Sequence, residues 1–213
     1  MQRFFDICFS LLALMVFSPF LFICGLILKF TGEGEVFYSQ QRIGLNQKKF
    51  DLLKFATMVK DSEKMGSGTV TIKDDPRVLP FGKFLRKTKI NELPQLLNVL
   101  FGDMSVVGPR PLAAKQFSFY SDDAKNIIGS VRPGLSGAGS VIFRDEELIL
   151  SGDNIDYDLI YQTKITPLKA RLEIWYVENK SIYLYFKLII LTVLVVLKKD
   201  LNTKKYFNGV NFE

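Results

Sequence analysis

Hydrophobic residues dominate the first thirty positions, and no charged residue occurs between Ile7 and Leu28. A helix of this length is long enough to cross a bilayer. Ser18 and Pro19 lie near the middle of the run, where proline removes a helix hydrogen bond and bends the axis. The pattern fits three structures: a signal peptide, a straight spanning helix, or a bent helix that returns to the side it entered. A signal peptide is disfavoured because the run is long and no A-x-A site follows it.

A second apolar segment, Ile182–Leu197, is interrupted by Lys187 and is therefore too short to span a bilayer cleanly. Tyrosines at its start and Trp175 before it are typical of the membrane interface, and a Lys198-Lys199 pair follows it. This pattern predicts a helix that lies in the interface or against the core. A fully buried core helix is the alternative.

Between these segments the pattern is mixed. Val36–Gln41 and Phe50–Phe55 read as two short strands around a polar turn at Asn46–Lys49, which predicts a hairpin. The polar stretch Asp61–Asp75 predicts a surface loop or a frayed helix end, and Asp122–Ile128 has a helical pattern. No internal repeat or low-complexity linker divides this region. The fold class is therefore predicted as α+β, mainly helical, with one soluble domain.

A helix is also predicted around Pro94, because proline is tolerated in a first turn. With Asn91 as its N-cap, the helix carries an apolar stripe and ends at Gly102. Asn91 and Glu92 would then lie at its positive end, where anions bind well. The stripe has i, i+3, i+4, i+7 spacing and consists of Leu93, Leu96, Leu97 and Leu100.

Composition restricts the chemistry. The chain has 28 Lys and Arg against 22 Asp and Glu, and a net charge of +6. This excess suits nucleic acid or an anionic membrane surface. The apolar segments favour the membrane, and no DNA- or RNA-reading motif is present, so no nucleic-acid partner is expected. Histidine is absent, so proton transfer must rest on carboxylates, Lys, Tyr or water. Walker and Rossmann glycine motifs are also absent, which disfavours P-loop and NAD enzymes.

Several cations stand beside the predicted helix start or beside rigid Pro and Gly turns. Arg110, for example, is held between Pro109 and Pro111. Bidentate arginine contacts are a strong way to hold a diphosphate. The residues that we expect to gather around such a group are Lys54, Arg86, Arg110 and Arg132.

Five motifs in one order resemble the monotopic phosphoglycosyl transferases, bacterial enzymes that initiate glycan assembly on a polyprenyl phosphate. They are QQRIG, KFATM, DPRVLPFGKFLRKT, GDMSVVGPRP and VRPGLSG, which begin at Gln40, Lys54, Asp75, Gly102 and Val131. The resemblance implies a re-entrant Ser-Pro helix at residues 1–30 and a transferase domain at 31–213 on the cytoplasmic face of the bacterial inner membrane. It also implies Mg2+, a UDP-sugar and undecaprenyl phosphate, with release of UMP. The oligomeric state is left open, a homodimer included.

The main departure from the family is the pair Asn91-Glu92, where members carry Asp-Glu with the Asp as nucleophile and magnesium ligand. An amide cannot ionise, although its carbonyl oxygen can weakly bind magnesium. Three accounts remain: Glu92 is the nucleophile, Glu92 is a base for direct attack by the lipid phosphate, or the chain is a pseudoenzyme or scaffold. We expect Glu92 to be the essential carboxylate.

Two further departures affect specificity. Ala56 replaces a residue that is often basic, and Ala138-Gly139-Ser140 follows VRPGLSG where the family often has Trp-Ala-Gln. The acidic cluster Asp145–Glu147 is an alternative source of the missing acid, and Asp103 is another.

Overall fold

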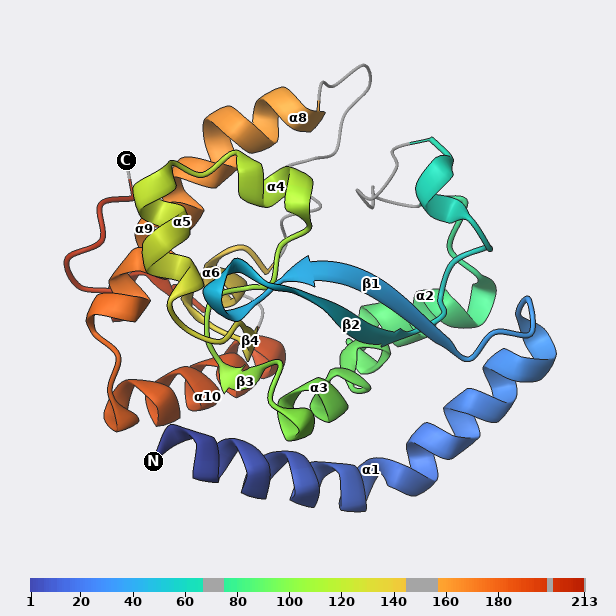
Figure 1. The fold of residues 1–213 in the computed structure, drawn as a ribbon. Helices are drawn as coiled ribbons and strands as arrows, with labels where there is room; N and C mark the ends of the chain where they lie inside the picture. The colour runs from blue at the N-terminus through green and yellow to red at the C-terminus, as the bar shows by residue number, and fades with distance from the viewer. Residues whose placement is uncertain (67–74, 145–156, 199–200, 213) are drawn as a thin grey trace.

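The computed structural model describes residues 1–66, 75–144, 157–198 and 201–212. Figure 1 shows a long N-terminal helix beneath a body built of shorter helices and two small sheets. The described elements follow the predicted α+β, mainly helical class. The helices are α1 (Gln2–Thr31), α2 (Pro80–Lys87), α3 (Gln95–Phe101), α4 (Ala114–Ser118), α5 (Asp122–Gly129), α6 (Ala138–Ile142), α8 (Tyr157–Ile160), α9 (Thr166–Glu178) and α10 (Ile182–Leu197).

Helical single turns connect several of these elements. The 3₁₀ turns are η1 (Leu45–Gln47), η2 (Ser62–Lys64), η3 (Ile90–Glu92) and η5 (Lys204–Tyr206), and η4 (Tyr161–Ile165) is a π-helical turn that joins α8 to α9.

The two sheets each have two strands. β1 (Phe37–Ile43) pairs antiparallel with β2 (Lys49–Phe55), which confirms the predicted hairpin. β3 (Ser105–Val107) pairs parallel with β4 (Gly134–Ser136). The β3–β4 pair brings the segments after α3 and after α5 together. The predicted helix at Asp122–Ile128 is α5, which ends one residue later.

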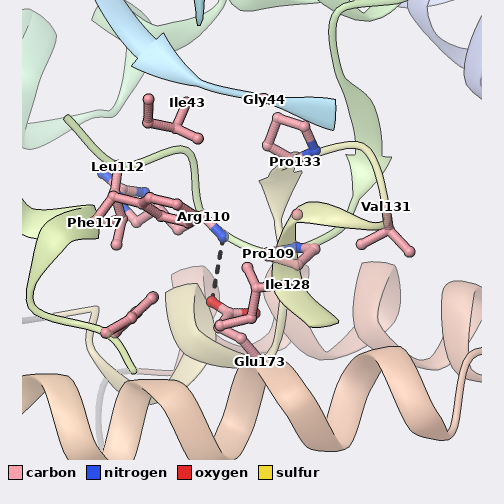
Figure 2. Close-up of a pocket in the computed structure, with 12 residues that line it drawn as sticks. Ile43, Gly44, Pro109, Arg110, Leu112, Phe117, Ile128, Val131, Pro133 and Glu173 are labelled. Atoms are coloured by element: carbon pink, nitrogen blue, oxygen red, sulfur yellow. Dashed lines mark hydrogen bonds between the residues drawn. The ribbon is translucent and has the colours of Figure 1, made fainter. Parts of the chain in front are cut away.

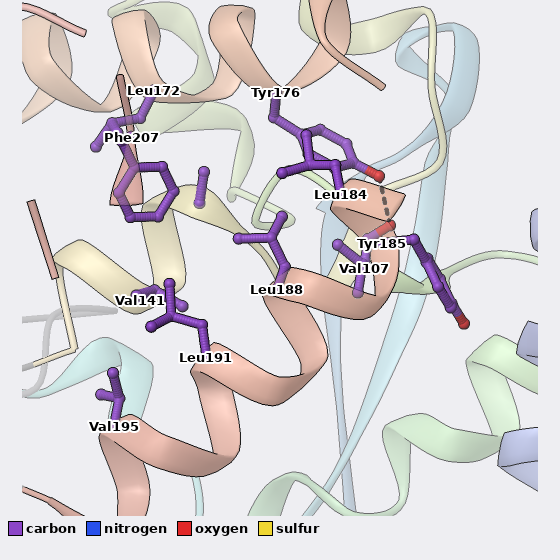
Figure 3. Close-up of a cluster of buried hydrophobic side chains, with 11 residues drawn as sticks. Val107, Val141, Leu172, Tyr176, Leu184, Tyr185, Leu188, Leu191, Val195 and Phe207 are labelled. Carbon is purple, nitrogen blue, oxygen red and sulfur yellow. Dashed lines mark hydrogen bonds between the residues drawn. The ribbon is translucent and has the colours of Figure 1, made fainter. Parts of the chain in front are cut away.

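The largest hydrophobic cluster lies between α9, α10, α6 and β3 (Figure 3). Leu188 and Leu191 from α10 pack with Leu172 from α9, and the Tyr176 hydroxyl donates to the Val107 carbonyl at 3.0 Å. The other face of α10 leaves apolar side chains exposed, including Tyr183, Ile190, Val193 and Val196. This helix therefore packs against the core along one face and presents an apolar face outward.

α1 is the one helix in the described ranges that is long and apolar enough to cross a membrane. It changes direction about halfway along (Figure 1), and Pro19 is the one proline inside it. Its first turns dock on the body, where the buried carboxylate of Asp6 accepts hydrogen bonds from Ser105, Val106 and Tyr185. Its last turns dock as well, because Leu28 is buried in another cluster of the body.

Between positions 11 and 20, no side chain of α1 is buried against the described residues. Large apolar side chains there are exposed, and only 17% of its most apolar window is buried. The exposed residues include Leu12, Met15, Val16, Phe22 and Ile23. A soluble protein rarely exposes a continuous apolar face of this size.

The start of α3 differs from the prediction. Asn91 is not an N-cap: it lies inside the turn η3, and α3 begins only after Pro94. The physical reason is that Pro94 has no N–H to donate to Ile90, so this stretch is held by i→i−3 bonds such as Leu93 N–H to the Ile90 carbonyl. The predicted end is correct, because Gly102 closes α3 with φ of 100°.

Candidate active site

The turn η3 places Asn91 and Glu92 side by side. Lys89 precedes them in a left-handed conformation, with φ of 60°, which turns the chain sharply out of α2. Asn91 is only 6% exposed, and its carbonyl oxygen Oδ1 has no hydrogen-bond partner among the described residues. A buried polar atom without a partner costs stability, and this oxygen is therefore available as a donor to a ligand.

The Glu92 carboxylate is surrounded by positive charge. Its Oε1 atom lies 3.6 Å from an Arg110 guanidinium nitrogen, and the side chain is 19% exposed. Burial opposes ionisation of this carboxyl, but nearby cations outweigh that effect and lower its pKa. The cations act in the order Arg110, Lys54, Lys89 and Arg86. Glu92 is therefore ionised at neutral pH.

Lys54 reaches the same place from β2. Burial lowers the pKa of its ammonium group to about 7, because Glu92 only partly offsets burial and three arginines oppose the charge. The arginines are Arg42, Arg110 and Arg86. Lys54 therefore titrates near neutral pH.

Arg42 belongs to this group, although it was not among the predicted site residues. Burial and the nearby Arg110 charge lower its pKa to about 10. Its Nε atom is buried without a hydrogen-bond partner in the described part of the chain. Strand alternation could have found it, because Tyr38 pairs with Lys54 and Arg42 is on the same face as Tyr38.

Arg86 comes from the last turn of α2. A guanidinium nitrogen lies 3.5 Å from the Thr57 hydroxyl. α2 approaches this segment closely at Gly82, where a Cβ atom would lie 2.3 Å from the Thr57 carbonyl oxygen. A glycine at position 82 therefore lets α2 pack against the end of the hairpin and brings Arg86 to the site.

The loop Pro109–Pro111 carries Arg110 across from Glu92. The Pro109 carbonyl accepts from the Gly134 N–H at 2.8 Å, and the Arg110 N–H donates to Glu173 of α9 at 3.2 Å (Figure 2). Burial raises the pKa of the Glu173 carboxyl to about 7, with the Arg110 N–H, Lys169 and the Arg110 charge acting in opposition. Sequence analysis missed Glu173, because nothing local marks a contact across 63 positions.

Arg132 is placed differently from the other predicted cations. Its Nε atom donates to the Gly102 carbonyl at 2.8 Å, so this guanidinium caps the end of α3. It is not among the charges that shift the pKa of Glu92 or Lys54. The structure thus brings together Lys54, Arg86, Arg110 and Glu92, and it adds Arg42.

The alternative acids do not join this group. Asp103 accepts a hydrogen bond from Asn98, whose amide also bonds the β2 backbone at Asp51 and Leu53. The cluster Asp145–Glu147 lies outside the described residues. Within the ranges that the structure describes, no set of three Asp, Glu, Cys or His side chains forms a metal cluster. A cation here would have to rely on one carboxylate, one amide oxygen and a ligand's own phosphates, a donor set that Mg2+ accepts.

Taken together, the site is a half-buried group of cations around one ionised carboxylate, that of Glu92. Such an arrangement can hold a diphosphate and can offer Glu92 as nucleophile or base.

Comparisons with known proteins agree with this chemistry. Residues 1–199 match the family model described as bacterial sugar transferase. The exopolysaccharide production protein ExoY of Sinorhizobium fredii is 36% identical over 196 residues, which cover 85% of this chain and 78% of that protein. The undecaprenyl-phosphate galactose phosphotransferase of Salmonella typhimurium is 32% identical over 94% of this chain. The UDP-glucose:undecaprenyl-phosphate glucose-1-phosphate transferase of Klebsiella pneumoniae is 36% identical over 90% of it.

The matched share of these relatives differs. The chain spans most of ExoY, but the alignments cover 41% of the Salmonella protein and 39% of the Klebsiella protein. Because the family model covers nearly the whole chain, and relatives above 30% identity align with 85% and 94% of it, the chain belongs to the bacterial sugar transferase family.

Proposed function

We propose that this chain transfers a phosphosugar from a UDP-sugar to undecaprenyl phosphate and releases UMP. The observation that carries the proposal is that one ionised carboxylate, Glu92, lies in a group of four cations. These cations are Lys54, Arg42, Arg86 and Arg110. The site therefore has an excess of positive charge, which a diphosphate would neutralise. Relatives named for undecaprenyl-phosphate galactose and glucose transfer support the same reaction class.

Glu92 is the essential carboxylate in this proposal. As a nucleophile, it would attack the phosphorus that bears the sugar, and the bond from that phosphorus to UMP would break. A lipid phosphate oxygen would then displace Glu92. As a base, it would instead assist direct attack by the lipid phosphate. Arg110, 3.6 Å from Glu92, would hold the reacting phosphate beside it in either case.

Asn91 and Glu92 are the residues that would hold Mg2+. The buried Oδ1 of Asn91, which has no hydrogen-bond partner among the described residues, and the ionised carboxylate of Glu92 are oxygen donors on consecutive residues. When bound, the ion would supply charge neutralisation for the substrate diphosphate. Asn91 is a weaker ligand than an aspartate because its oxygen carries no formal charge.

The proposed location is the cytoplasmic face of the bacterial inner membrane. Both ends of α1 contact the same body while its apolar middle is exposed, which supports a re-entrant path in one leaflet. The exposed apolar face of α10 would lie in the interface. Inner-membrane lipids are therefore proposed partners.

Release of UMP tests this function directly. The purified chain is incubated with Mg2+, undecaprenyl phosphate and a panel of UDP-sugars, and UMP is quantified. We expect turnover with at least one sugar, a loss of about a thousandfold or more in Glu92→Gln, and equal or higher activity in Asn91→Asp. Glu178→Gln, at an exposed position of α9, is the matched control.

Two outcomes would contradict the proposal. Near-normal turnover in E92Q would move the essential acid elsewhere, to Asp103 or to Asp145–Glu147. An inactive chain that becomes active only as N91D would identify an inactivated enzyme.

A further inference from the structure

The backbone of the Arg110 loop is held by a group that belongs to neither the hairpin nor the η3 turn. Pro109 and Pro111 have no N–H, so the Arg110 N–H is the only backbone donor of this tripeptide. That single donor bonds Glu173 Oε1 of α9 at 3.2 Å (Figure 2). The loop is fixed on its other side by the bond from Gly134 to the Pro109 carbonyl.

Burying the carboxyl group of Glu173 at this position costs folding free energy. It is 2% exposed, and its second oxygen, Oε2, has no hydrogen-bond partner in the described ranges. A leucine would fill a similar space without burying a carboxyl group, so packing does not account for a glutamate. Buried carboxyl groups beside a site are typical of functional positions.

The chain also leaves room for this carboxyl group. Gly139 of α6 faces it, and a Cβ atom at position 139 would lie 2.3 Å from Glu173 Oε1. Gly139 belongs to the Ala138-Gly139-Ser140 stretch in which the sequence departs from its family. The absence of a side chain there lets Glu173 reach the Arg110 backbone.

We infer that Glu173 is a positioning residue for the Arg110 loop: its carboxyl group fixes the Arg110 backbone so that the guanidinium faces Glu92 and the substrate diphosphate. Glu173 contacts the backbone of the loop and lines the same pocket as Pro109, Arg110 and Pro133. It acts on the ligand only through Arg110. The inference rests on the proposed function, since it assumes that Arg110 binds a diphosphate.

Binding of UDP with Mg2+ to the full chain, measured by calorimetry in detergent, tests this role without requiring turnover. Glu173→Leu removes the acceptor, and we expect UDP affinity to fall about tenfold. Glu173→Gln keeps an oxygen that accepts the same N–H, so it should restore most of that affinity. Glu178→Leu, at the exposed end of the same helix, should change nothing.

A double-mutant cycle separates positioning from general destabilisation. If Glu173 acts through the Arg110 side chain, then E173L should weaken UDP binding in the wild-type background and have no further effect in Arg110→Ala. Additive losses would overturn the inference, as would unchanged affinity in E173L. If wild-type protein bound no UDP, the proposed function would fail instead, which is a different result.

A second variant covers the case in which E173L does not fold. Gly139→Ala leaves both Arg110 and Glu173 in the chain but pushes the carboxyl group away from the Arg110 N–H. We expect it to lower UDP affinity in the wild-type background and to have no further effect in R110A. Unchanged UDP affinity in folded G139A would contradict the inference.

Discussion

At the scale of single residues, Lys54 is a pH-sensitive cation of the site. The pKa of its ammonium group is lowered from 10.5 to about 7, first by burial and then by neighbouring arginines that outweigh Glu92. Between these two values the unfolded chain binds a proton that the folded chain has lost. The contribution of Lys54 to the free energy of unfolding therefore rises with pH across that window, and it is lowest below pH 7.

This pKa predicts how ligand binding responds to pH. Lys54 loses its charge above pH 7 in the free protein, so UDP binding must take up a proton there. We expect UDP affinity to fall by up to about tenfold per pH unit above pH 7 relative to Lys54→Arg, whose guanidinium stays charged. Calorimetry from pH 6 to 8.5 measures this difference.

Lys48→Arg is the control for the Lys54 prediction, because Lys48 is exposed in the hairpin turn. It should follow the wild-type pH profile. An identical profile in K54R and wild type would show that another group titrates.

Residue patterns predicted part of this site and could not predict the rest. Glu92 and Arg110 stand in recognisable motifs, so their meeting was foreseeable. Arg42 was foreseeable in principle, since strand alternation puts it on the Lys54 face. Glu173 was not, because its partner is a backbone N–H in a distant loop. Arg132 was assigned to the phosphate site because a Pro-Gly turn follows it. In the structure its guanidinium instead donates to the Gly102 carbonyl at the end of α3.

At the scale of elements, the first two turns of α1 are held to the body by polar contacts. Asp6 is 2% exposed, and its Oδ1 atom accepts from the Ser105 hydroxyl, the Val106 N–H and the Tyr185 hydroxyl, each at 2.9 Å. Arg3 adds a bond to the Leu100 carbonyl at the end of α3, at 2.7 Å. A helix that only entered lipid would not need these side chains.

Replacing Asp6 tests whether this junction stabilises the fold. Asp6→Ala leaves several buried donors without an acceptor, and we expect a loss of about 3 kcal/mol in the free energy of unfolding. Thermal unfolding in detergent should show a clearly lower midpoint. Cys8→Ser, exposed on the same helix, should leave the midpoint unchanged. A D6A midpoint equal to wild type would mean that the junction adds no stability.

Local sequence patterns predicted an element correctly where a single feature determines its position. The hairpin follows from alternation around a polar turn, and the end of α3 follows from Gly102. The start of α3 was harder, because Pro94 fits both a first helical turn and the position just before one. The i→i−3 bonds that decide between them become visible only in the structure.

At the scale of the whole molecule, the path of α1 decides where the site lies. Because both ends of α1 contact one body, we expect positions 2 and 31 to lie on the same side of the membrane. Single cysteines at Gln2 and Thr31, in a Cys8→Ser, Cys24→Ala background, should both react with impermeant maleimide only after the cytoplasmic side is opened. Labelling of position 2 from the periplasmic side would establish a spanning helix instead.

The contacts of Gln2 and Asp6 also have a consequence for how the chain is made. Their partners lie about one hundred positions away at Ser105 and Val107, and Tyr185 is 179 positions from Asp6. α1 is synthesised before all of these partners, and the contact between Asp6 and Tyr185 can form only after α10 has been made. Until then the apolar helix lacks part of this junction, which exposes it to aggregation unless lipid receives it early. A chain that ends before α10 would therefore lack the Tyr185 hydroxyl among the donors to Asp6, although Ser105 and Val106 would already be present.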